Sequence, residues 1–150
     1  MAIAVLMVAV MPNLRTGMTG LQAERSAFEL AQQIRVARTL AITNGEAIDW
    51  LWDSGAHRAA LQTQGSATEW PSRFKRPLQL APELSLLICR DREPVSDIHF
   101  LPDGTSGSSD HPNLSTTVIL KRAERPRYQI VVDGASGRVD VAESASVSAC

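Results

Sequence analysis

The first eleven residues form an unbroken apolar run without a charged side chain, MAIAVLMVAVM. A helix that spans a bilayer needs about 20 such residues, so this run is too short to cross a membrane alone. It also lacks the basic start and the small-x-small cleavage pattern of a secretory signal. Because it leads directly into a helical pattern, we interpret Met1–Met11 as the downstream half of a membrane helix. A buried strand or core helix is the alternative.

An amphipathic helical pattern follows Pro12. Apolar residues recur at intervals of three, four or seven, which places them on one helical stripe. The stripe comprises Leu14, Met18, Leu21, Phe28, Ala31, Ile34, Ala37 and Ala41, and the opposite face carries Gln22, Glu24, Glu29, Gln32, Arg35 and Arg38. The pattern therefore predicts one helix over residues 13–45, packed on a sheet, after a partial membrane or filament-core helix over residues 1–12.

Local features indicate where this helix weakens and ends. Gly17 and Gly20 each cost about 1 kcal/mol relative to alanine in a helix, so we expect bending or melting between Pro12 and Gly20. Asn44 and Gly45 readily adopt the left-handed conformation that ends a helix.

After Gly45 the apolar period changes from about 3.6 to 2, which predicts strands. The stretch from Gln64 to Glu83 holds several prolines and predicts a surface connection. We expect five to seven short strands, at 48–52, 58–63, 84–89, 97–101, 116–121, 128–133 and 138–141. The fold class is therefore α+β, with a long N-terminal helix, an antiparallel sheet or sandwich over residues 46–142 and a tail over 143–150.

Composition and motifs argue against an enzyme. The chain has 150 residues, 44% of them apolar, which suits one domain, and its net charge of -1 does not draw it to nucleic acid. It contains neither a G-x-S-x-G nucleophile turn nor a glycine-rich phosphate loop. His57, His99 and His111 lack metal-site spacing. We expect no active site, cofactor, metal or small-molecule substrate.

Two cysteines occur, Cys89 and Cys150, without the C-x-x-C spacing of a metal or redox motif. In an oxidising compartment such as the bacterial periplasm they can form one disulfide. Two unpaired thiols are the alternative.

The order of these features resembles the GspH/FimT family of minor pseudopilins. The match covers essentially the whole chain. Its residues are Ala37, Arg38 and Ala41–Gly45 on the helix, then Phe100-Leu101-Pro102-Asp103-Gly104, and finally Gly137-Arg138-Val139.

The resemblance implies a pilin-like fold and a structural subunit of a bacterial envelope filament. In such proteins the N-terminal helix rests in the inner membrane and later packs in the filament core, while the globular part faces the periplasm. Family members begin with a leader and a G-F-T-L-x-E motif that a prepilin peptidase cleaves before methylation, and this sequence lacks that motif. The implied partners are other pseudopilins and secretion-system proteins.

Two functions follow from the resemblance. The first is a subunit of the type II secretion pseudopilus, acting in protein export across the outer membrane. The second is a FimT-like minor pilin of a type IV pilus that binds DNA for uptake. That branch carries a basic terminal hairpin, whereas Arg138 here is followed closely by Asp140, which makes nucleic acid the less favoured partner.

The expected assembly surface is the start of the helix. Leu14, Met18 and Leu21 continue the apolar run but lie too close to the N-terminus for the sheet to cover them all. An uncovered apolar stripe on a soluble domain usually marks a partner site.

Overall fold

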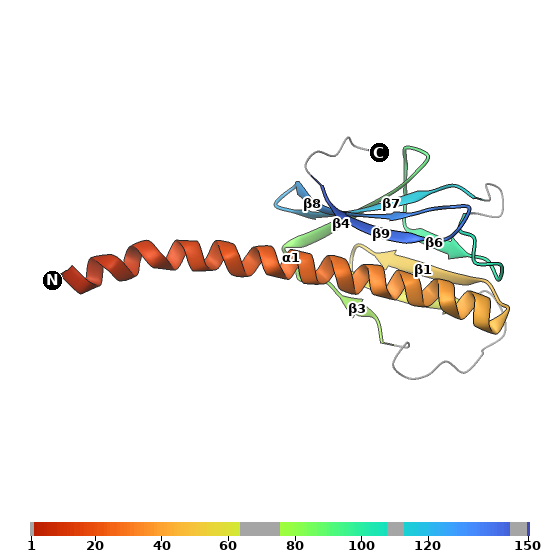
Figure 1. Ribbon diagram of the computed structural model, residues 1–150, viewed down its shortest axis with the longest axis horizontal. Coiled ribbons are helices and arrows are strands. Elements are labelled where there is room, and N and C mark those ends of the chain that lie inside the picture. Colours follow the sequence, from red (N-terminus) through yellow and green to blue (C-terminus); the bar gives the residue numbers. More distant parts are fainter. Residues whose placement is uncertain (1, 64–75, 108–112, 145–149) are drawn as a thin grey trace.

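The computed structural model describes residues 2–63, 76–107, 113–144 and 150, with side chains from Leu21 onward. Its first element is helix α1, Ala2–Asn44. The N-terminal part of α1 projects away from the rest of the molecule, and the C-terminal part lies along the strands (Figure 1).

Helix α1 runs through Pro12, Gly17 and Gly20 without a break, so the melting expected there is wrong. A proline removes one backbone hydrogen bond, and each glycine costs only about 1 kcal/mol. The turns on either side remain helical, and the ribbon curves gently in this part instead of breaking (Figure 1). The helix ends as expected, because the Gly45 N–H donates to the Ala41 carbonyl and Gly45 has a φ of 67°.

The strands of the described residues form two antiparallel sheets. One sheet has the order β3-β2-β1-β6 and the other β5-β4-β7-β8-β9. The strands are β1 Ile48–Asp53, β2 Arg58–Thr63, β3 Leu78–Gln79, β4 Leu84–Arg90, β5 Glu93–Val95, β6 Asp97–Phe100, β7 Thr116–Arg122, β8 Arg125–Val132 and β9 Val139–Glu143. The predicted α+β class with antiparallel sheet is confirmed.

The strand count exceeds the predicted five to seven, because the predicted strands did not include β3 or β5. Both are edge strands of two or three residues, too short to show an apolar alternation. Strand β3 lies in the expected surface connection, of which residues 64–75 fall outside the described part. Residues 108–112, between β6 and β7, likewise fall outside the described part.

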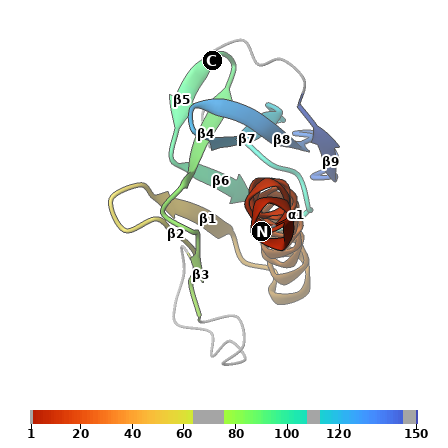
Figure 2. The ribbon, with the colours of Figure 1, turned by 90° about the vertical axis from the view of Figure 1, so that its left-hand side faces the viewer.

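The core lies where α1 packs against both sheets. The helix contacts β1 and β6 of the first sheet and β7, β8 and β9 of the second. Viewed along α1, the helix lies at the side where the two sheets meet (Figure 2). Trp50 is fully buried, and its indole N–H donates to the Gln33 side-chain oxygen at 2.9 Å. This hydrogen bond satisfies the one polar atom of a large core side chain.

The buried face of α1 differs from the predicted stripe. Phe28, placed in that stripe, is 52% exposed, whereas Ala23, Ala27 and Leu30 are buried. The buried face is therefore rich in alanine, whose small side chain lets the helix approach the strands closely. Ala31, Ile34, Ala37 and Ala41 were placed correctly, since each is fully buried.

Candidate assembly surface

Two exposed apolar residues of α1 lie on the face turned away from the sheets. Leu21 is 66% exposed and Phe28 is 52% exposed. They are seven residues apart, or about two helical turns, so they share one face. Leu14 and Met18 precede Leu21 by seven and three residues in the same helix, and their side chains lie outside the described ones. Sequence reasoning missed Phe28 as part of this face because hydrophobicity alone favoured its burial.

A charged pair lies beside these apolar residues on the exposed side of α1. Arg25 donates to Glu29 at 2.8 Å, one helical turn apart, and both side chains are well exposed. The Glu29 carboxylate raises the pKa of Arg25 through this hydrogen bond. An exposed pair of this kind contributes little to stability, so its charges remain available to a partner.

The residues of the F-x-P-D-G motif end strand β6 and form the following turn. Phe100 is fully buried in the core, while Pro102 and Asp103 are exposed. The Asp103 carboxylate accepts hydrogen bonds from the N–H and the hydroxyl of Thr105, and these bonds lower its pKa. Gly104 has a φ of 84°, a conformation that favours glycine.

The two glycine-containing motifs meet at Arg38. The Arg38 Nε donates to the Gly104 carbonyl at 3.1 Å. At Gly137 a Cβ would come within 2.7 Å of the same Nε and within 2.0 Å of the Gly104 carbonyl oxygen. Arg38 was placed on the solvent face of the helix, but it is half-buried and joins α1 to both turns. These motif residues therefore connect α1 to the turns that follow β6 and β8.

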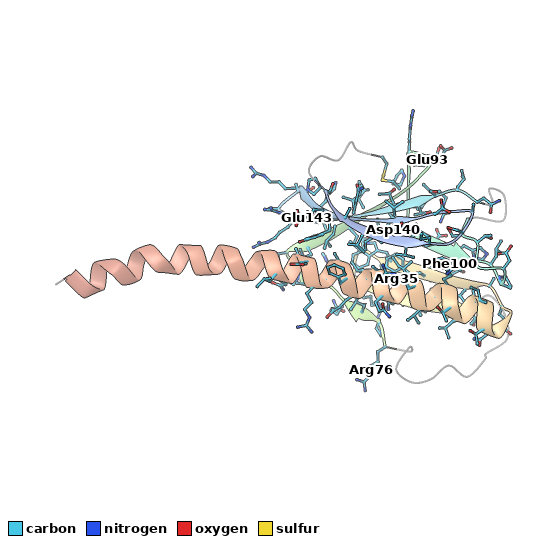
Figure 3. The ribbon with its side chains drawn as sticks, viewed as in Figure 1. Arg35, Arg76, Glu93, Phe100, Asp140 and Glu143 are labelled. Carbon is cyan, nitrogen blue, oxygen red and sulfur yellow. A yellow bond between two sulfur atoms is a disulfide. The ribbon has the colours of Figure 1, made fainter. Side chains whose placement is uncertain are left out.

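The turn between β8 and β9 is ordered by Asp133. Its carboxylate accepts hydrogen bonds from the hydroxyl and from the N–H of Ser136. Both bonds lower the pKa of Asp133, and the bond from the hydroxyl has the larger effect. Arg138 follows this turn and pairs with Asp140 at 2.9 Å. Arg35 reaches from α1 to the Val139 carbonyl at 2.8 Å, an anchoring contact that the sequence did not indicate. Arg35 and Asp140 are labelled in Figure 3.

The two cysteines lie together in the structure. A disulfide joins Cys89 of β4 to Cys150, with the Cα atoms 5.4 Å apart. It ties the C-terminal residue to the second sheet across a sequence separation of 61.

The histidines do not gather. His99 is buried in β6 beside the Asp49 carboxylate of β1. His57 lies in the turn between β1 and β2, and its ring is edge-on to that of Trp52 in β1. His111 falls outside the described residues. Within the described ranges, no group of three or more His, Cys, Asp or Glu side chains could hold a metal ion.

Among the described residues, no helix combines the length and the apolar character that crossing a membrane requires.

Comparison with known proteins gives matches at the level of structure. No protein-family model matches the sequence, and no curated protein matches it. Several solved structures resemble the fold, and two crystal structures among them serve as examples. The minor pseudopilin EpsH from the type II secretion system of Vibrio cholerae has a TM-score of 0.66 and 15% identity, covering 86% of this chain and 99% of its own. The type IV minor pilin FimU of Pseudomonas aeruginosa has a TM-score of 0.60 and 18% identity, covering 82% and 90%.

Both likenesses extend over most of each chain. They agree with the arrangement described above, in which one long N-terminal helix packs on antiparallel sheets. The chain therefore has the pilin-like α+β fold of minor pseudopilins and type IV minor pilins.

Proposed function

We propose that this chain is a GspH-like minor pseudopilin, a structural subunit of a type II secretion pseudopilus that acts in protein export across the outer membrane. The observation that carries the proposal is the exposed apolar face of α1 at Leu21 and Phe28. This face follows the apolar N-terminal run in the sequence. Such a face favours burial against the helix of another subunit. The likeness to EpsH supports the same assignment.

The cellular location belongs to the same proposal. Before assembly, the N-terminal end of α1 rests in the bacterial inner membrane, as its apolar run Met1–Met11 favours. The sheets face the periplasm, where the Cys89–Cys150 disulfide is stable. After assembly the same helix packs in the pseudopilus core. Other pseudopilins and secretion-system proteins are then the partners.

The second candidate is a type IV minor pilin that binds DNA. The likeness to FimU, a type IV minor pilin, favours membership of a pilus but says nothing of DNA binding. The charge of the terminal hairpin argues against DNA. Arg138 is held by Asp140 at 2.9 Å, which offsets the cation that would contact a phosphate. We therefore favour the secretion subunit.

The test changes the exposed face and measures assembly. Leu21→Glu combined with Phe28→Glu should abolish co-purification with partner pseudopilins, because burying an unpaired carboxylate costs several kcal/mol. The melting temperature should stay nearly unchanged, because neither side chain belongs to the core. The matched control is Ile42→Glu, an apolar residue 46% exposed near the other end of α1. Co-purification that survives the double substitution would rule out this surface.

Leu14 and Met18 extend the proposed surface toward the N-terminus. Leu14→Glu with Met18→Glu should likewise block incorporation without lowering the melting temperature. If the domain unfolds instead, these residues belong to the core and the proposed surface is wrong.

A further inference from the structure

A cavity lined mostly by polar and charged residues lies between α1 and the turn that joins β8 to β9. Its volume is about 530 Å³, enough for a side chain of another molecule. The lining includes three arginines from two separate elements. The cavity residues used below are Arg35, Arg38, Thr39, Ser136, Arg138 and Asp140.

Backbone hydrogen bonds position two of the guanidinium groups. Arg35 donates through Nη2 to the Val139 carbonyl, and Arg38 donates through Nε to the Gly104 carbonyl. A guanidinium group has five N–H donors, so each arginine keeps further donors. In the part of the chain that the structure describes, neither arginine forms an ion pair.

The cavity has an excess of positive charge. Arg138 is paired with Asp140, so the lining has three cations and one anion, and the difference is two positive charges. A guanidinium group matches the planar geometry of a carboxylate and can bind it through two parallel hydrogen bonds.

We propose that this cavity binds a carboxylate, supplied by an acidic side chain of a neighbouring filament subunit. The inference rests on the proposed function only for the source of that carboxylate. The cavity would then select a partner by charge, in addition to the apolar contact made by the exposed face of α1.

The surrounding charges favour an isolated carboxylate over nucleic acid. Asp133 and Asp103 lie in the two turns that flank the cavity, and both are ionised at neutral pH, as ordinary aspartates are. Asp140 adds a third negative charge at the cavity itself. A DNA duplex carries one negative charge per about 1.7 Å of helix axis, so it would meet these carboxylates, whereas one acidic side chain can avoid them.

The proposal is tested by titrating the full-length chain with oligoglutamate whose ends are blocked. Calorimetry or NMR measures the binding. Oligoglutamate should bind and oligoglutamine should not. Arg35→Gln should weaken oligoglutamate binding about tenfold, because it removes a charge-assisted hydrogen bond. The matched control is Arg125→Gln, the same change at an exposed arginine of β8 away from the cavity, and it should leave binding unchanged. Asp140→Asn should strengthen binding, because it removes the competing anion.

A second variant covers the case in which Arg35→Gln disturbs the fold. Thr39→Glu places a carboxylate at the exposed edge of the cavity and keeps every arginine, and it should also weaken oligoglutamate binding. Equal binding of oligoglutamine, or an equal loss in Arg125→Gln, would overturn the proposal. The proposal would also be overturned if a DNA duplex bound more tightly than oligoglutamate and Arg35→Gln weakened that DNA binding. Because these titrations need no filament, their failure leaves the proposed assembly role to be judged by co-purification alone.

Discussion

Arg38 of the long helix lies directly against Gly137 of the β8–β9 turn, with no room for a side chain between them. A Cβ at Gly137 would lie 2.7 Å from the Arg38 Nε. The same Nε donates to the Gly104 carbonyl, so one arginine joins the helix to the turns that follow β6 and β8. This contact brings together two glycine-containing motifs that are far apart in the sequence.

The first prediction concerns this contact. Gly137→Ala should lower the free energy of unfolding by about 3 kcal/mol, from the positive φ of 64° and from overpacking against Arg38 and Gly104. Gly45→Ala is the matched control, since Gly45 has a φ of 67° but no atom within 4 Å of the added Cβ. It should cost only about 1 kcal/mol. Urea denaturation measures both. Equal losses would mean that the turns relax around the new methyl group without cost.

The second prediction is a pH dependence at Asp133. Its pKa is lowered in the folded state, so its contribution to stability is present above the unfolded value of about 3.9 and is lost as the pH falls through the folded value. Asp133→Asn should therefore be less stable than the parent at neutral pH. The difference should shrink once the pH drops below about 4.

The control for that experiment is Ser136→Ala, which removes the hydroxyl that donates to the carboxylate. In this background the pH-dependent part of the Asp133→Asn effect should be reduced, and the bond from the Ser136 N–H should keep the rest. Urea denaturation at a series of pH values gives both comparisons. A stability difference that stays constant down to strongly acidic pH would contradict the proposed role of the ionised carboxylate.

The third prediction concerns the disulfide. In the chain-entropy model, closing a loop with a sequence separation of 61 stabilises the folded state by about 4 kcal/mol. Cys150→Ser should lose about this amount, and adding a reductant to the parent should have a similar effect. Reductant should leave Cys150→Ser unchanged, which is the control. Thiol titration of the unreduced, denatured parent should find no free thiol, and two free thiols per chain would rule the bridge out.

The fourth prediction is that the chain without Met1–Met11 remains a folded, soluble monomer. The buried side chains of the described part begin at Ala23, well beyond the deleted run. Thermal unfolding of the shortened chain should be cooperative, with a melting temperature close to that of the parent. Loss of the cooperative transition would show that the run belongs to the globular core and would remove the membrane interpretation.

The sequence alone determined the elements whose signal is local. The alternation around Trp50 and Trp52 predicted the β1–β2 hairpin, and Asn44-Gly45 predicted the end of the helix. These patterns depend on neighbouring residues and on the period of the backbone, so they can be read without knowing the rest of the fold. The α+β class followed from their order along the chain.

Only the tertiary structure decided which residues of the helix face the sheets. Hydrophobicity favoured burial of Phe28, but the strands come close enough to α1 that alanines such as Ala23 and Ala27 occupy the interface and Phe28 is left exposed. The meeting of Arg38 with Gly104 and Gly137 likewise joins residues 66 or more positions apart in the chain. Such contacts depend on the distance between packed layers, and a local sequence pattern carries no information about that distance.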